Sequence, residues 1–96
     1  MKATTSIPTS DAKKIAKRLL NHWKHKFEVD ELHLEDQRTV YSIMMPDALV
    51  RMVASTDLLI VELDTKREDY KVLEKVVIDH LNRMAHQEFN VEWEHE

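Results

Sequence analysis

The middle of the chain holds three short segments in which apolar and polar residues alternate, and this pattern constrains the fold most. The segments are 39–45 "TVYSIMM", 49–55 "LVRMVAS" and 58–64 "LLIVELD", joined by connections of three and two residues. Alternation with period two is typical of strands with one buried face, and such short connections join antiparallel neighbours. The face predicted to be buried consists of Tyr41, Ile43, Met45, Val50, Met52, Ala54, Leu59, Val61 and Leu63.

Two amphipathic segments flank this meander and predict helices. The first begins with a cap at Thr9 or Ser10 and runs to about Lys26. The second begins with the capping box Thr65–Glu68 and runs to about residue 86. Helical spacing gathers apolar residues on one face of each segment. These residues are Ala12, Ile15, Ala16, Leu19, Leu20 and Trp23 in the first, and Tyr70, Leu73, Val77, Leu81 and Met84 in the second, with Val76 at its margin.

Three further strands are predicted at 3–7, 28–34 and 89–93 "FNVEW", which gives the order β-α-β-β-β-β-α-β. A meander between two helices favours a two-layer arrangement, because each amphipathic helix must bury its apolar face. The sequence therefore predicts one α+β domain over residues 1–96, a two-layer sandwich with both helices on one face of an antiparallel sheet.

The chain contains neither cysteine nor glycine, and both absences exclude classes of site. Without cysteine it has no disulfides, thiolate zinc ligands or thiol nucleophile. Without glycine it lacks the phosphate-binding loops and the GxSxG elbow, and its turns are expected to rely on Asp, Asn and Pro. No segment has the length of a membrane span and no secretory signal follows Met1, so we expect a cytoplasmic protein.

Charge is distributed unevenly along the chain. Residues 1–26 carry seven Lys/Arg and one Asp, whereas residues 27–96 carry seven Lys/Arg and seventeen Asp/Glu. This asymmetry indicates either a binding surface or two parts of one fold that attract each other. The net charge of −4 and the core-facing positions of both Trp and both Phe argue against nucleic-acid binding. The apolar face of the first helix is needed for the core, which argues against a membrane surface.

The solvent side of the meander is less polar than a solvent-exposed sheet face should be. Ser42, Arg51, Ser55 and Glu62 interrupt an otherwise apolar surface. A contiguous apolar patch on a small protein often marks an association surface, although strand propensity alone also favours such residues. Homodimerisation is the commonest form of association. The candidate association surface consists of Val40, Met44, Leu49, Val53, Leu58 and Ile60.

The stretch "NHWKHKF" places His22 and His25 three residues apart, a spacing that resembles a metal motif. Arg18, Lys24 and Lys26 surround these histidines, and no carboxylate lies between residues 12 and 27. A divalent cation would be repelled there, so the sequence predicts no metal site.

An anion or small ligand fits the same helix end better than a cation does. His80 lies at the apolar margin of the second helix, and helices packed side by side would place His22 and His80 along one seam. The candidate ligand-binding residues are His22, His25, Lys26 and His80. The alternative is that these histidines are structural, with ring nitrogens bonded to backbone or water.

No constellation of residues supports an enzyme. Four serines lack a neighbouring His/Asp pattern, and the carboxylates lie on faces of mixed charge. Lys26 near the apolar helix face is the one residue that could be considered for a Schiff base. We therefore assign no catalytic residue and expect no cofactor.

Two separated stretches resemble a family of small bacterial proteins numbered 2218 among the domains of unknown function. In "NHWKHKF" the matching residues are His22, Trp23, His25, Lys26 and Phe27. In "LEKVVIDHLNRMAHQEFNVEW" they are Val76, Val77, His80, Leu81 and Arg83. The resemblance extends from "IPTSDA" to Trp93, although the family often has cysteine, glycine and an aromatic at Met84 that this chain lacks.

This resemblance implies a fold similar to the TATA-binding-protein-like or phosphohexomutase C-terminal class. It implies no established activity and an iron or siderophore context. Together, the residues and the resemblance predict a non-enzymatic module that associates with itself or with a protein partner. The alternative is a small-ligand or anion-binding protein that uses the His22–Lys26 helix end and His80.

Overall fold

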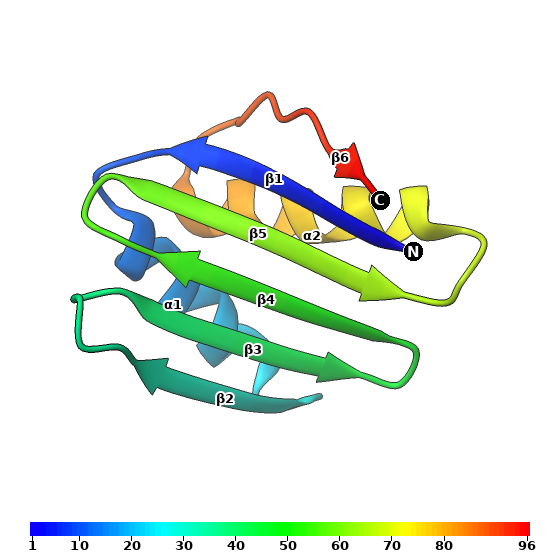
Figure 1. Ribbon diagram of the computed structural model, residues 1–96, viewed down its shortest axis with the longest axis horizontal. Helices are drawn as coiled ribbons and strands as arrows, with labels where there is room; N and C mark the ends of the chain where they lie inside the picture. Colours follow the sequence, from blue (N-terminus) through cyan, green and yellow to red (C-terminus); the bar gives the residue numbers. More distant parts are fainter.

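A computed structural model describes residues 1–96 and contains one antiparallel sheet with two helices. The elements are β1 (Lys2–Pro8), α1 (Ala12–Trp23), β2 (Glu28–His33), β3 (Thr39–Met45), β4 (Ala48–Ala54), β5 (Leu58–Thr65), α2 (Tyr70–Ala85) and β6 (Glu94–His95). The sheet order is β2-β3-β4-β5-β1-β6, and both helices lie on the same face of the sheet (Figure 1). The predicted fold class and element order are confirmed. Neither helix is long and apolar enough to cross a membrane.

The inner face of the meander forms the core with the apolar faces of the helices. Eight of its nine predicted residues are buried, and the ninth, Met45, is half-buried at the end of β3. The period-two prediction is therefore confirmed along β3, β4 and β5. The buried positions on these strands are Tyr41, Ile43, Val50, Met52, Ala54, Leu59, Val61 and Leu63.

Helix α1 buries the whole predicted apolar face, but its predicted ends are wrong. It begins at Ala12 after Asp11 and has no side-chain cap, because Thr9 accepts only the Asp11 N–H, at 3.1 Å. It ends at Trp23 rather than Lys26. Residues 24–26 form a turn in which the N–H groups of Lys26 and Phe27 both donate to the Trp23 carbonyl, at 2.9 and 2.8 Å.

The predicted capping box at Thr65–Glu68 is also wrong. Thr65 is the last residue of β5, and α2 begins only at Tyr70. The Thr65 hydroxyl accepts the Arg67 N–H at 3.1 Å and donates to the Asp47 carbonyl at 2.7 Å. Thr65 therefore stabilises a turn between strand and helix instead of the helix itself.

The C-terminal segment follows the sheet edge in a way the sequence did not predict. Residues 89–93 are not a strand, although Phe89, Val91 and Trp93 pack against the core. The strand is Glu94–His95, which pairs with β1 through Ala3 and Thr4. His95 also reaches the buried carboxylate of Glu74 with its Nε2, at 2.6 Å.

Two residues other than glycine occupy the left-handed region that glycine usually takes. Gln37 lies in the β2–β3 turn with φ of 70°, and His86 ends α2 with φ of 56°. Turns here therefore use Gln and His as well as the expected Asp, Asn and Pro. Between the basic residues 1–26 and the acidic remainder there is one ion pair, Lys17–Glu31.

The outer face of the sheet alternates between apolar and polar rows that cross the strands. One row consists of directly paired apolar residues from four strands, Leu32, Val40, Val53 and Ile60. The next row holds Ser42, Arg51 and Glu62, and the one beyond it pairs Met44 with Leu49. The remaining residue of the predicted surface, Leu58, pairs with Pro8 at the start of β5.

Candidate functional site

A pocket of about 280 Å³ opens where the end of α1, helix α2 and the β3–β4 turn meet. Most of its wall is apolar, with aromatic rings contributed by α1 and the turn after it. Its polar groups come from four separate parts of the chain. The lining residues are Trp23, Lys26, Phe27, Met45, Pro46, Asp47, Ala48, Arg67, Leu73, Val76 and His80.

The turn after α1 builds the aromatic wall. Because the Phe27 N–H bonds to the Trp23 carbonyl, the chain folds back and the two rings meet edge to face, 6.1 Å apart at 79°. Trp23 is buried in the core and Phe27 is half-buried. The exposed Lys26 between them stays at the rim, with Nζ 5.5 Å from the centre of the Phe27 ring.

His80 lines the pocket from α2 and packs against α1. Its ring lies 4.9 Å from that of Trp23, and its Nδ1 lies 2.7 Å from the Val76 carbonyl oxygen. A carbonyl only accepts, so Nδ1 carries the proton and donates. No buried side-chain nitrogen or oxygen in the protein lacks a hydrogen-bond partner. Because Nε2 of His80 has no partner, it is not buried and is accessible from the pocket.

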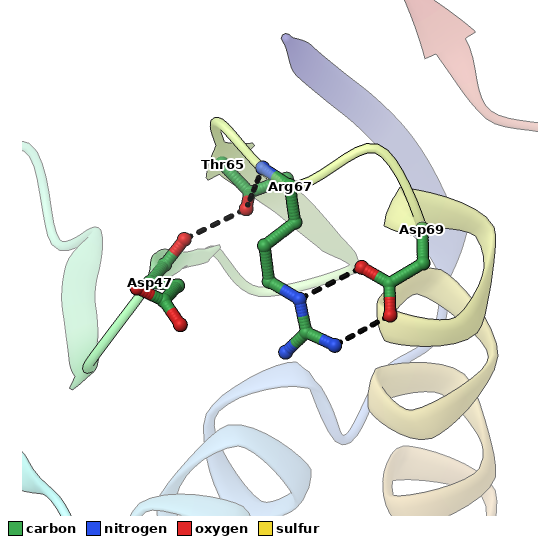
Figure 2. A network of polar contacts seen from close by, with 4 residues as sticks. All are labelled: Asp47, Thr65, Arg67 and Asp69. Atoms are coloured by element: carbon green, nitrogen blue, oxygen red, sulfur yellow. Dashed lines mark hydrogen bonds and ion pairs between the residues drawn. The ribbon is translucent and has the colours of Figure 1, made fainter.

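Arg67 enters the pocket from the segment that joins β5 to α2. Figure 2 shows its side chain between Asp47 of the β3–β4 turn and Asp69 at the start of α2. Arg67 Nε and Nη2 donate to the two Asp69 carboxylate oxygens, at 2.8 and 2.5 Å. Thr65 links the backbone of Arg67 to that of Asp47. The guanidinium is therefore held at one edge, while both N–H groups of Nη1 remain without a protein partner.

The ion pair fixes the charges of both partners. The hydrogen bonds with Arg67 hold the pKa of the Asp69 carboxyl below its usual value, and the same bonds raise the pKa of Arg67. Both groups are therefore charged at neutral pH. A wider hollow of about 760 Å³ adjoins the pocket and shares five lining residues with it, Met45, Pro46, Asp47, Ala48 and Arg67.

The structure brings together part of the predicted ligand site. Lys26 and His80 both line the pocket, and His22 lies on the predicted seam with its ring 5.6 Å from that of His80. His22 is exposed, however, and does not line the pocket. His25 is exposed among the cations of the turn and lies outside the pocket as well.

Sequence reasoning missed Arg67 and Asp47. Arg67 falls inside "TKRE", which has the pattern of a capping box and therefore predicts a helical position. Asp47 lies in "MPDA", where a turn explains it without any further role. No group of three or more His, Asp or Glu side chains is arranged to hold a metal ion.

Comparison with known proteins agrees with the resemblance in the sequence. The family described as "Uncharacterized protein conserved in bacteria (DUF2218)" matches residues 4–94. The NMR structure of PA4090 from Pseudomonas aeruginosa is similar at 33% identity, over 97% of this chain and 94% of that one, with a TM-score of 0.73. No curated protein matches the chain.

Proposed function

We propose that this chain, which belongs to the DUF2218 family of uncharacterised bacterial proteins, binds a small anionic molecule in the pocket between α1, α2 and the β3–β4 turn. One observation carries the proposal. Two cations, Lys26 and Arg67, and the accessible nitrogen of His80 line a single pocket whose walls are otherwise mostly apolar. A concave apolar site with a few converging polar groups is the usual form of a small-molecule site.

The size of the pocket limits the ligand. Sites for drug-sized molecules have volumes of roughly 300–1,000 Å³. At about 280 Å³ this pocket lies just below that range, so it suits a ligand of about one ring and its substituents. Apolar contact with Phe27, Leu73 and Val76 would supply affinity, and the cations would supply orientation.

A thermal-shift screen of small anions tests the proposal. The panel contains acetate, benzoate, phosphate, citrate and dihydroxybenzoate, of which the last two also probe the iron or siderophore context. A ligand at about 100 times its Kd stabilises the folded protein by about 2.7 kcal/mol, which is readily detected. We expect at least one panel member to raise Tm in the wild type.

The matched variants are Arg67→Gln and Arg51→Gln. Both arginines are about equally exposed, at 40% and 43% of the side chain, but Arg51 lies on the outer face of the sheet beside Glu62. We expect Arg67→Gln to abolish the shift in Tm and Arg51→Gln to keep it. A panel without any shift, or an equal shift in both variants, contradicts the proposal.

A second proposal is association of two copies through the outer face of the sheet. It is supported by the cross-strand row Leu32, Val40, Val53 and Ile60, in which apolar side chains from four strands lie side by side without a covering layer. Leu32, which the sequence did not assign to this surface, is 54% exposed and extends the row to the edge strand. The two proposals concern opposite faces of the sheet and are independent.

A further inference from the structure

On the basis of the proposed function, we propose that the ligand is a monocarboxylate with a flat apolar body and a hydrogen-bond donor, held by Arg67 and Lys26 at the carboxylate and by His80 at the donor. The proposal goes beyond anion binding because it excludes phosphates and polyanions as the preferred class. Four features of the pocket support it.

The charge at the rim suits a single negative charge. Lys26 and Arg67 contribute two cations, but Asp47 also lines the pocket and Asp69 is bonded to Arg67. The charged residues that line the pocket are therefore two cations and one carboxylate, a net charge of +1 that one negative charge on the ligand would balance. A ligand with a second negative charge would meet Asp47 and Asp69 without a further cation to offset them.

The geometry at Arg67 suits a planar carboxylate. Asp69 occupies Nε and one side of Nη2, so the free donors are the two N–H groups of Nη1 and one of Nη2. These groups lie in one plane, and two parallel N–H bonds from a guanidinium match the two oxygens of a carboxylate. Lys26 adds a point charge at the same rim.

The pocket lacks the backbone donors that phosphate sites use. Phosphate loops depend on consecutive N–H groups presented by glycine-rich or left-handed backbone. The chain has no glycine, and its two left-handed residues, Gln37 and His86, line no part of this pocket. The first turn of α2 does not supply donors either, because α2 lines the pocket only through Leu73, Val76 and His80.

The walls suit a flat ring with one donor. The rings of Trp23, Phe27 and His80 line the same pocket, and aromatic walls favour offset or edge-on contact with another ring. His80 Nδ1–H donates a hydrogen bond to Val76 O, so in the neutral ring Nε2 is an acceptor. A hydroxyl or N–H on the ligand would satisfy it, whereas a wholly apolar ring would not.

NMR titration of the isotope-labelled protein tests the ligand class with four probes at constant ionic strength. The probes are benzoate, para-hydroxybenzoate, phenyl phosphate and inorganic phosphate. We expect benzoate to bind about fivefold more tightly than phenyl phosphate, which carries the second charge. We expect para-hydroxybenzoate to bind about 2- to 10-fold more tightly than benzoate, because one neutral hydrogen bond typically changes affinity by about that factor.

The variant His80→Phe separates the two ends of the site. It keeps a ring beside Trp23 but removes the acceptor, so it should bind benzoate and para-hydroxybenzoate equally well. Arg67→Gln should weaken both benzoates, and Arg51→Gln should weaken neither. NMR spectra of each variant establish that it is folded.

Three results overturn the inference in distinguishable ways. If either phosphate binds as tightly as benzoate and loses affinity in Arg67→Gln, the pocket binds anions but the monocarboxylate class is wrong. If none of the four probes, nor any anion of the thermal-shift panel, perturbs signals of pocket residues, the proposed function fails as well. A preference for para-hydroxybenzoate that persists in His80→Phe overturns the role of His80.

Discussion

Tyr41 is a buried side chain of β3 that lies near the ion pair of Lys17 and Glu31. Burial raises the pKa of its phenol above the ordinary value, the Glu31 carboxylate raises it further, and Lys17 opposes this to a smaller extent. The folded protein therefore holds the phenol proton more tightly than the unfolded chain does. Packing of a single residue thus changes the acidity of its side chain.

The stability of the protein is expected to fall at alkaline pH because of Tyr41. Its folded pKa is raised, so its contribution is fully present below the unfolded value of 10.0 and is lost as pH rises through the folded pKa. One such group adds a slope of at most about 1.4 kcal/mol per pH unit. Urea denaturation of wild type and Tyr41→Phe between about pH 9 and 11 measures this slope of the free energy of unfolding. Identical slopes in the two proteins would show that Tyr41 has no part in it.

Histidines illustrate at the same scale why sequence position alone does not assign a role. His22 and His80 were expected along one seam between the helices, and their rings do lie close together. Only His80 lines the pocket, because α2 presents it toward Trp23 while His22 is exposed on α1. His25 was expected among Arg18, Lys24 and Lys26, and it is exposed in the turn after α1.

The element that shapes the pocket is the β3–β4 turn, and Thr65 attaches it to the end of β5. The Thr65 side chain is buried and uses its hydroxyl twice, as donor to Asp47 O and as acceptor from Arg67 N–H. The strand meander was predictable because alternation is a local property of each strand. The link between the turn and the β5–α2 segment was not, because it joins residues 18 apart in the chain.

Replacement of Thr65 with Val should destabilise the protein by about 1–3 kcal/mol. Valine has the same shape but leaves a carbonyl and an N–H without partners in a partly buried position. Thr4→Val on β1 is the matched control, since the Thr4 side chain makes no hydrogen bond within the protein and should change stability by at most about 0.5 kcal/mol. Urea denaturation compares the two. A loss for Thr65→Val no larger than that of the control would mean that the turn is held by other contacts.

The whole molecule has one covered and one uncovered sheet face. Both helices lie over the inner face, and no element covers the outer one (Figure 1). Apolar rows on the outer face alternate with the polar row that contains Arg51 and Glu62, which lie 3.9 Å apart. If two copies associate, this alternation would set their register, because a shift by one row would place apolar side chains against charged ones.

Ile60→Asp should convert an associated form of the protein to a monomer. Ile60 lies at the end of the apolar row, and a carboxylate there would have to be desolvated in any face-to-face contact. Light scattering at high micromolar concentration measures the mass of both proteins. Val72→Asp is the control, since Val72 is 57% exposed on α2 and should leave the mass unchanged. A wild-type monomer at that concentration, together with an unchanged mass and solubility of Ile60→Asp, would end the association proposal.

The sequence by itself determined the fold class, the inner faces of the strands and the buried face of α1. Each of these features rests on a periodic pattern of many apolar residues, so one residue that departs from the pattern does not change the prediction. It did not determine the helix starts, because the hydroxyl of Thr65 can accept an N–H in a capping box or in a turn, and only packing against Asp47 selects the turn. It also misplaced the last strand, because pairing at Glu94–His95 depends on which edge of the sheet is free.

The candidate site was determined mainly by tertiary structure. Lys26 and His80 were predictable because a cation at a helix end and a histidine at an apolar margin are visible locally. Arg67, Asp47 and Asp69 were not, because their roles depend on contacts among the β3–β4 turn, the β5–α2 segment and α2. A pocket is formed by residues that are distant in the chain, and the distances between them are set by how the layers pack rather than by any local pattern.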